Sequence, residues 1–358
     1  MSSAALEIDQ VEVAYGAVRV LKGVSLAIGG GEFVALLGSS GCGKTTLLRA
    51  ISGFVPVASG AIRVDGRDIT RAPPDRREMA MVFQSYALWP HMTVAQNIGY
   101  GLRLRRQARS EIQRRVDEVL AMLKLGGFGQ RMVTQLSGGQ RQRVALGRAL
   151  AVNPKILLLD EPLSNLDARI REDVRHEIKA LQQSIGITAI HVTHDREEAM
   201  VMADRIVILD AGDIVQAGAP EEVYNRPNSP FVAAFMGAAN AIELRARDEA
   251  EQIVIEAGPH NGEARIARAD GAASGPVVVH FRSEAAHLTD PGAPGGGEEL
   301  VLRGRIAQSS YPGGFWRYAV RVGDRQFMVD DERRLAVGAE VGIRLPANAL
   351  HVYPRTMQ

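Results

Sequence analysis

Short apolar runs separated by helical segments dominate the first part of the chain. The runs are rich in Val, Ile and Leu and lack polar alternation; they occupy residues 33–38, 155–160, 188–193 and 205–210. Nearly continuous runs of this kind are typical of strands that are buried on both faces of a mainly parallel sheet. Between them, residues 110–125 and 168–184 have the pattern of surface helices. The alternation predicts an α/β core.

Two changes of pattern divide the chain further. Residues from Ser85 to about Val152 are mostly helical in pattern and interrupt the strand series, which predicts a helical subdomain inserted into a mixed sheet. After residue 236, short β-like runs alternate with Gly- and Pro-rich turns such as 290–299. This spacing is typical of a small all-β barrel. We therefore predict a first domain at 1–236, with its helical subdomain at about 85–152, and a second domain at 237–358.

Composition limits the classes of function. The chain has 358 residues, 23% charged and 46% hydrophobic, as in a globular protein of two domains. Its net charge of +1 argues against a large electrostatic footprint for nucleic acid or an anionic membrane, and a single cysteine excludes an intramolecular disulfide. Neither a signal peptide nor an apolar stretch of membrane-spanning length is evident. We expect a cytoplasmic protein that acts at a membrane only through the helices of other proteins.

A phosphate-binding loop follows the first apolar run. The segment GSSGCGKTT fits the pattern G-x-x-x-x-G-K-[ST] between a predicted strand and a predicted helix. Lys44 supplies a compact positive charge, and the Thr45 hydroxyl is placed to coordinate Mg²⁺ beside a nucleoside triphosphate. By itself the loop predicts only nucleotide binding, and the residues predicted to bind the nucleotide here are Gly38, Ser39, Ser40, Gly41, Cys42, Gly43, Lys44, Thr45 and Thr46.

Two adjacent carboxylates end the run at 155–160. In ILLLDEP, four apolar residues carry Asp160 to the carboxyl end of a buried strand, where ligands of open α/β sheets gather. Asp160 is the candidate for the Mg²⁺ shell, and Glu161, on the other side of the pleat, is the candidate general base for the attacking water.

Together, GSSGCGKTT, LSGGQ and ILLLDEP resemble the ATP-binding subunit of ABC transporters, for which LSGGQ is the signature sequence. The resemblance implies that Tyr15 stacks on adenine, that Gln84 reaches Mg²⁺ and the water, and that His194 contacts the γ-phosphate. Each has a plainer alternative, since Tyr15 resembles a sheet aromatic, Gln84 a loop polar residue and His194 a structural histidine. Five motifs in the expected order favour the catalytic interpretation.

The signature sequence raises the question of why one ATPase needs a second anion site. In the family that the chain resembles, two ATP-binding domains pair head to tail, so the signature of one contacts the γ-phosphate held by the other. Ser137 and the amides of Gly138, Gly139 and Gln140 would form this contact at a helix N-terminus. Asp167, in the segment SNLD, would cross the same interface. The alternative is that Ser137 and Asp167 are plain helix caps.

Further resemblances concern partners. Residues 84–100 resemble the part of importer ATPases that receives a coupling helix of a transmembrane permease. Apolar and aromatic surface for this contact would come from Tyr86, Leu88, Trp89 and Pro90, each of which has a buried core position as its alternative. The β-rich tail resembles the OB-like regulatory (TOBE) domain of importer ATPases, although Arg282-Ser283-Glu284 replaces the usual Arg-Pro-Glu.

The leading hypothesis is an ATPase subunit that forms a homodimer on the inner face of the membrane and drives a separate permease. A periplasmic or extracellular solute-binding protein would deliver the solute, with polyamine, ferric iron or phosphonate suggested by the FMGAAN junction. The alternative is a soluble ATPase that acts on nucleic acid or ribosomes through its C-terminal barrel, using the aromatic segment 311–318 and Arg303, Arg305 and Arg317. The near-neutral charge argues against nucleic acid.

Overall fold

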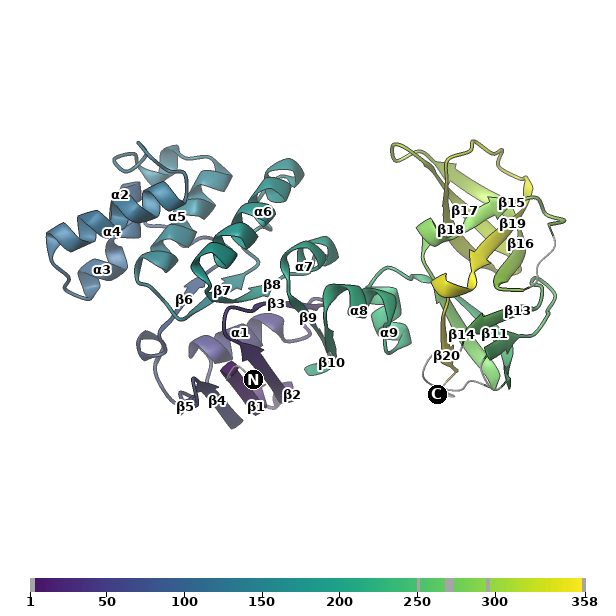
Figure 1. Ribbon diagram of the computed structural model, residues 1–358, viewed down its shortest axis with the longest axis horizontal. Coiled ribbons are helices and arrows are strands. Elements are labelled where there is room, and N and C mark those ends of the chain that lie inside the picture. Colours follow the sequence, from purple (N-terminus) through teal and green to yellow (C-terminus); the bar gives the residue numbers. More distant parts are fainter. Residues whose placement is uncertain (1–3, 250–251, 268–273, 294–296, 356–358) are drawn as a thin grey trace. The chain divides into compact units, whose positions relative to one another are not determined.

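The chain divides into two compact units, Met1–Glu221 and Glu222–Gln358 (Figure 1). A computed structural model describes residues 4–249, 252–267, 274–293 and 297–355. Part of the predicted Gly-rich turn, residues 294–296, lies outside this description. The division between the two units, at 221/222, lies before the predicted domain boundary at 236/237. The boundary at 236/237 stays a prediction.

A mixed sheet forms the centre of the first unit. Its strand order is β10-β9-β3-β8-β7-β6, in which only the β10–β9 pair is antiparallel among these named strands. The central strands β3, β8 and β7 are buried at every residue, which explains why their sequences lack alternation. The bounds are β3 Phe33–Gly38, β6 Met79–Val82, β7 Ile156–Asp160, β8 Thr188–Val192, β9 Arg205–Asp210 and β10 Asp213–Gly218.

An antiparallel sheet, which the sequence pattern did not reveal, packs beside the central sheet. Its order is β2-β1-β4-β5, and α1 lies between the two sheets in one shared apolar core. The strand β2 alternates buried and exposed residues, because one of its faces meets the core and the other faces solvent. The bounds are β1 Ala4–Tyr15, β2 Val18–Gly29, α1 Lys44–Ser52, β4 Ser59–Val64 and β5 Arg67–Asp68.

Helices occupy the chain between β6 and β7, as the sequence predicts for this stretch (Figure 1). They are α2 Val94–Ile98, α3 Tyr100–Leu104, α4 Arg109–Met122 and α5 Gly138–Ala151. Two further helices follow β7 and β8, namely α6 Ala168–Ile185 and α7 Arg196–Met202. The helix α7 packs on β3 of the central sheet, and α6 packs on α7. Because β7 and β8 are parallel neighbours, the loops that leave their carboxyl ends lie beside the phosphate-binding loop that leaves β3.

The second unit is β-rich. The short helices α8 Pro220–Asn225 and α9 Pro230–Phe235 precede two antiparallel sheets, ordered β13-β12-β11-β14-β20 and β15-β19-β16-β17-β18. The two sheets share one apolar core that includes Phe281, Tyr318 and Phe327. The strands are β11 Asn240–Glu249, β12 Gln252–Ile255, β13 Ala264–Ala267, β14 Gly275–Phe281, β15 His287–Thr289, β16 Glu299–Ser310, β17 Trp316–Val322, β18 Arg325–Asp331, β19 Glu340–Pro346 and β20 His351–Pro354.

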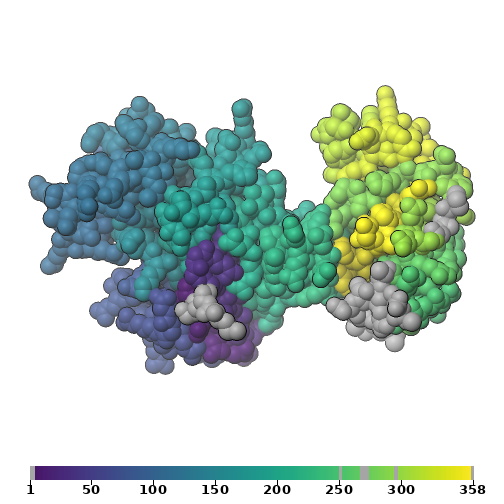
Figure 2. All heavy atoms as spheres, in the orientation of Figure 1, coloured from purple at the N-terminus to yellow at the C-terminus, as the bar shows by residue number. Residues whose placement is uncertain are grey.

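In the space-filling view, the green and yellow spheres of the second unit come from residues far apart in its sequence that share one surface (Figure 2). This β-rich architecture is that of an OB-like domain, as the spacing of the β-like runs predicts. Within the described residues of the whole chain, no helix is long and apolar enough to cross a membrane.

Arg282 has a structural role in the second unit. It is buried and lies over the Tyr224 ring, with the guanidinium carbon 3.6 Å from the ring centroid, and donates to the Tyr224 carbonyl at 2.6 Å. It also lies 3.2 Å from His351 Nε2, so that a neutral His351 accepts its hydrogen bond. Ser283, which stands where proline is usual in the family that the chain resembles, pairs with Asp330 at 3.1 Å.

The His351 site predicts a pH-dependent stability. Burial, followed by the charges of Arg282 and His280, lowers the pKa of His351 to about 4. The unfolded chain therefore takes up a proton between about pH 6.5 and 4 that the folded chain does not, so this contribution is complete above pH 6.5 and is lost as the pH falls toward 4. We expect the urea midpoint of the wild type to fall more steeply over this window than that of His351→Gln, which keeps an acceptor for Arg282. Equal pH slopes for the two proteins would contradict this assignment.

Candidate functional site

The phosphate-binding loop joins β3 to α1 and depends on glycine at two positions. A Cβ atom on Gly38 would lie 2.3 Å from the Leu209 carbonyl oxygen, and one on Gly43 would lie 2.8 Å from Leu21 Cδ2. Gly43 also has a φ of 110°, in the region that favours glycine, and it is the N-cap residue of α1. Larger residues at these two positions would therefore displace the loop. The loop leads into the N-terminus of α1, where backbone amides are available to bind an anion.

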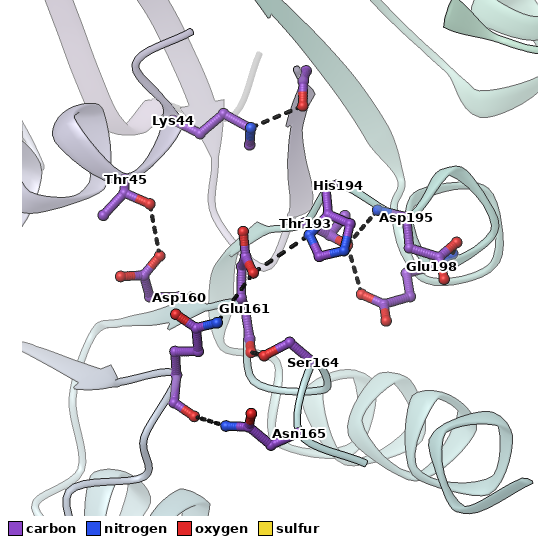
Figure 3. Close-up of polar contacts among 12 residues, drawn as sticks. Lys44, Thr45, Asp160, Glu161, Ser164, Asn165, Thr193, His194, Asp195 and Glu198 are labelled. Carbon is purple, nitrogen blue, oxygen red and sulfur yellow. Dashed lines mark hydrogen bonds and ion pairs between the residues drawn. The ribbon is translucent and has the colours of Figure 1, made fainter. Parts of the chain in front are cut away.

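The Lys44 side chain is hydrogen-bonded to the backbone of this loop. Its Nζ donates to the carbonyls of Gly38 and Ser39, each at 2.8 Å, and the residue is only 6% exposed (Figure 3). The ammonium group therefore sits at the centre of the loop, held by carbonyl dipoles and with no carboxylate bound to it among the described contacts. Its positive charge is available to an anion that the loop encloses.

Thr45 and Asp160 come together from distant parts of the chain. Thr45 Oγ1 donates to Asp160 Oδ1 at 3.1 Å, joining the first turn of α1 to the end of β7 (Figure 3). Asp160 is buried, and burial is the main cause that raises its pKa, against the lowering effect of the Thr45 hydrogen bond. A desolvated carboxylate with one hydroxyl partner is stabilised in its ionised form by a cation.

Glu161 stands at the centre of a second set of contacts. Its Oε2 accepts from Gln84 Nε2 at 3.4 Å and lies 3.4 Å from His194 Nδ1 (Figure 3). Its backbone has a φ of 45°, which a non-glycine residue rarely adopts, and its amide donates to the Val192 carbonyl at 3.1 Å. The turn after β7, rather than the pleat of the strand, thus directs the carboxylate toward Gln84 and His194.

A network of hydrogen bonds next to His194 stabilises the loop that carries it. Thr193 Oγ1 donates to Glu198 Oε2 at 2.7 Å and accepts from the Asp195 amide at 3.0 Å. The same Glu198 oxygen lies 3.2 Å from Nε2 of His191, which is fully buried. His191 is thus structural, whereas His194 is 61% exposed at its side chain.

Two residues in the SNLD segment form hydrogen bonds to the backbone of Gln84 and Glu161. Asn165 Nδ2 donates to the Gln84 carbonyl at 2.7 Å, and Ser164 Oγ donates to the Glu161 carbonyl at 3.0 Å (Figure 3). Asp167 caps α6 by accepting from the Ile170 amide at 3.0 Å. Sequence reasoning missed Asn165, Thr193 and Glu198, whose partners lie on other elements, and the only sequence signal was their adjacency to recognised motifs.

Ser137 and the signature glycines have defined roles within one chain. Ser137 is the N-cap of α5 and forms a reciprocal capping box with Gln140. A Cβ on Gly138 would lie 3.2 Å from Leu166 Cδ2, and one on Gly139 would lie 3.2 Å from Ile170 Cγ2. The paired glycines therefore also serve close packing of α5 on the SNLD loop and α6, a reason that the sequence did not reveal. Ser137 itself remains exposed.

Tyr15 lies at the end of β1 and is 51% exposed. It pairs with Val18 across the β1–β2 turn, and the following residues Val20 and Leu21 approach Gly43 closely. The aromatic ring is thus presented on the hairpin that adjoins the phosphate-binding loop, free of a core role.

The segment after Gln84 contains both buried and exposed aromatics. Tyr86 is buried at 8% exposure, so it is a core residue rather than a surface anchor, whereas Trp89 is 42% exposed. Arg148 of α5 fixes this segment by donating to the carbonyls of Tyr86 and Ala87 at 2.8 and 2.6 Å. Leu88 is half-buried and Pro90 is exposed. Trp89 packs on Tyr100 with ring centroids 5.6 Å apart.

Two of the three arginines of the alternative nucleic-acid surface, Arg305 and Arg317, are paired with acids. Arg317 donates to both carboxylate oxygens of Asp330 at 2.8 and 2.9 Å, and Arg305 donates to Glu340 at 2.9 Å. Such pairs cancel the positive charge that a phosphate backbone would require.

Cys42 provides a direct chemical probe of the loop. It is 4% exposed, its Sγ lies 3.7 Å from Lys44 Nζ, and a Cβ on Gly38 would lie 2.7 Å from it. We expect stoichiometric alkylation of this single cysteine to abolish ATP hydrolysis, because the adduct has no room beside the loop, and we expect ATP to slow the reaction. Mass spectrometry with an ATPase assay measures both. Full activity after complete modification would show that the loop tolerates the adduct.

Comparisons with known proteins identify relatives of the chain. The family model described as "ABC transporter" matches residues 21–164, and the one described as "TOBE domain" matches residues 279–353. The chain is 41% identical over 350 residues to the Fe(3+) ions import ATP-binding protein FbpC of Brucella melitensis biotype 1, covering 96% of each protein. It is 47% identical over 298 residues to the sn-glycerol-3-phosphate import ATP-binding protein UgpC 1 of Rhizobium johnstonii, covering 82% of this chain and 79% of the relative.

A third relative and a solved structure complete the comparison. The sulfoquinovosyl glycerol transport ATP-binding protein SmoE of Agrobacterium fabrum is 46% identical over 283 residues, covering 78% of this chain and 79% of that protein. The structure of cbiO1 from Clostridium perfringens, part of the ABC transporter complex cbiONQ, is similar with a TM-score of 0.59 and 29% identity. The match covers 63% of this chain and 92% of that one.

Proposed function

Because the chain belongs to the ATP-binding subunits of ABC importers and carries a TOBE domain, we propose that it hydrolyses two ATP at the interface of a head-to-tail homodimer and thereby drives a transmembrane permease. Its class as an ATP-binding import ATPase follows from the family. The observation that supports the site assignment is the meeting of Lys44, the Thr45–Asp160 pair and Glu161 at one edge of the central sheet.

The residues present fit ATP together with Mg²⁺. The amides of Gly41 to Thr46 surround the place of the phosphates, with Ser39, Ser40 and Lys44 beside them. A hard cation prefers oxygen, and Thr45 Oγ1, Asp160 and the side-chain amide oxygen of Gln84 would supply it. The buried Asp160 carboxylate, whose pKa is raised by desolvation, would be stabilised by that charge. When bound, Mg²⁺ neutralises charge that develops on the phosphates.

We assign the proton-accepting step to Glu161. Its carboxylate lies beside Gln84 and His194 and is 23% exposed, so it is open to a water molecule. Glu161 would accept the proton of the attacking water, Gln84 would orient that water, and His194 would donate to the γ-phosphate. The strained backbone at Glu161 and the Thr193–Glu198 network below His194 hold these groups in place before ATP binds.

The second half of each site would come from the partner copy. In one chain Ser137 and Asp167 cap helices, and Ser137 is exposed, with the amides of Gly138, Gly139 and Gln140 at the start of α5. A γ-phosphate held by the partner would accept from this N-terminus. Capping and phosphate binding are compatible, because a serine hydroxyl donates to the phosphate while it accepts from the Gln140 amide.

Permease docking would use the surface next to Gln84. Trp89 and Pro90 offer exposed apolar area, and the anchoring of Tyr86 and Ala87 by Arg148 connects this surface to the signature helix α5. We expect Arg148→Met to keep basal ATP hydrolysis and to lose most of its stimulation by the permease, measured in reconstituted vesicles. Undiminished stimulation would rule out this connection. Docking to the permease would place the subunit on the inner face of the membrane. A solute-binding protein would act on the other side.

Ferric iron is the solute that we propose. The FbpC relative, which covers 96% of this chain, is named for Fe(3+) import, whereas the glycerol-phosphate and sulfoquinovosyl glycerol relatives cover 82% and 78%. Deletion of the chain should abolish energy-dependent uptake of radiolabelled Fe³⁺ and leave uptake of sn-glycerol-3-phosphate and a polyamine unchanged. Loss of either organic solute with intact iron uptake would reassign the transporter.

A further inference from the structure

A cleft of about 500 Å³ lies between the end of α4, the helix α5 and the helix α6. The three helices belong to the first unit and stand side by side in Figure 1. None of the residues that line the cleft takes part in the ATP site described above. Its volume falls in the range of sites for small molecules, about 300–1,000 Å³.

The cleft results from the way in which α5 and α6 approach each other. At the N-terminal end of α5, Gly138 and Gly139 bring the helix against Leu166 and Ile170, where an added Cβ would lie 3.2 Å from each of these side chains. Farther along, Leu146 of α5 and Leu181 of α6 line the cleft from its two sides. The helices are therefore in close contact at their N-terminal ends, and the cleft lies farther along them.

The walls of the cleft are mainly apolar but contain one unusual polar group. Apolar side chains come from Met122, Leu123, Leu146, Val174, Ile178 and Leu181. Gln142, which also lines the cleft, is 2% exposed, and neither its amide nitrogen nor its amide oxygen has a hydrogen-bond partner in the described part of the chain. Buried amides are normally paired, since an unpaired one loses its hydrogen bonds to water without replacement. Gln142 therefore points to a missing partner.

Charged residues at the same cleft do not supply that partner. Arg143 donates to Glu177 at 2.9 Å, and Lys124 Nζ lies 3.9 Å from the same carboxylate. The Arg143 Nε is buried and has no partner among the described residues, so it adds one more free donor beside Gln142. The wall thus offers amide and guanidinium N–H donors together with one amide oxygen that needs a donor.

We propose that this cleft binds a small, largely apolar molecule that carries an uncharged amide or lactam edge. Both amide atoms of Gln142 are buried in the structure, so its side chain would turn toward the cleft on binding. The carbonyl of the ligand would then accept from Gln142 Nε2, and its N–H would donate to Gln142 Oε1. A carboxylate has no proton to give to Oε1, and an ammonium group cannot accept from Nε2. The apolar body would fill the space between Leu146 and Leu181.

Binding of a ligand in the cleft should alter the ATP site, a consequence that rests on the proposed function. The cleft separates the two helices whose first turns hold Ser137 and Asp167, the groups assigned to the partner's phosphate. A ligand that holds α5 and α6 apart or together changes the relative position of those two N-termini.

Octanamide is a suitable probe, and saturation-transfer NMR on the full chain detects its binding. We expect octanamide to bind, octylammonium to bind at least about tenfold more weakly, and Gln142→Leu to weaken octanamide by about tenfold or more. Leu181→Trp should abolish binding by filling the cleft. Gln183→Trp is the matched control, because Gln183 is exposed on the same helix and outside the cleft. No signal with the wild type, or octanamide signals from Gln142→Leu and Leu181→Trp that equal the wild-type signal, would overturn the site.

A second measurement tests the coupling separately. Saturating octanamide should change the ATPase rate of the wild type and leave that of Leu181→Trp unaffected. Binding without any change in rate would reject the coupling between cleft and ATP site. Because binding is measured without ATP, the ligand site is tested whether or not the proposed dimer mechanism is correct.

Discussion

A Glu161→Gln variant should bind MgATP and hydrolyse it about 10²–10⁴-fold more slowly than the wild type, because the amide cannot accept the proton of the attacking water. The substitution preserves size and an acceptor for Gln84 Nε2, so the 3.4 Å contact can persist. With hydrolysis blocked, the ATP-bound dimer should accumulate. Steady-state phosphate release and gel filtration with MgATP measure the two effects.

The matched control for this prediction is Glu172→Gln. Glu172 is an exposed glutamate on α6 with no part in the ATP site, and its substitution removes the same charge. The control should hydrolyse ATP at the wild-type rate. If Glu161→Gln were as active as this control, the base would have to be another group.

Ser137→Asp should abolish ATP hydrolysis while leaving ATP binding by the monomer unchanged. Aspartate is as good an N-cap as serine, and its charge is favourable at a helix N-terminus by about 0.3–1 kcal/mol, so α5 should be as stable as before. The new carboxylate would, however, face the partner's γ-phosphate. Loss of one oxyanion donor already costs about 10²–10³-fold, and repulsion between like charges adds to it.

The structure provides a close control in Thr93→Asp. Thr93 caps α2 with the same reciprocal capping box, formed with Gln96, that Ser137 forms with Gln140. Both variants place aspartate at a helix N-cap, but only Ser137 belongs to the signature sequence. Thermal melts should be alike for the two variants and ATPase rates should differ. Wild-type hydrolysis by Ser137→Asp would mean that the signature serine is only a cap.

Much of the fold follows from local sequence, because buried parallel strands impose a continuous apolar run. The strands β3 and β9 coincide with the predicted runs, and β7 and β8 differ by a single residue at one end. The antiparallel sheet built from β1, β2 and β4 was not predicted, since its half-exposed strands carry bulges and mixed patterns.

The site was predictable where the chemistry resides in contiguous motifs. The Thr45–Asp160 contact joins residues 115 positions apart, yet each belongs to a motif with a fixed place at the sheet edge. The support of His194 by Thr193 and Glu198 was not predictable, because it depends on how α7 packs on β8. Likewise, the burial of Tyr86 and the close packing of Gly138 and Gly139 depend on tertiary neighbours that no local pattern records.

The central claim, that two copies of the chain share each ATP, is tested most directly by light scattering on Glu161→Gln with MgATP. The account predicts a particle of twice the 38.6 kDa chain mass with two bound ATP. It also predicts that the double variant Glu161→Gln, Ser137→Asp stays at the mass of one chain with ATP bound. A Glu161→Gln protein that remains monomeric at high concentration, or a dimer that the Ser137 substitution leaves intact, would contradict it.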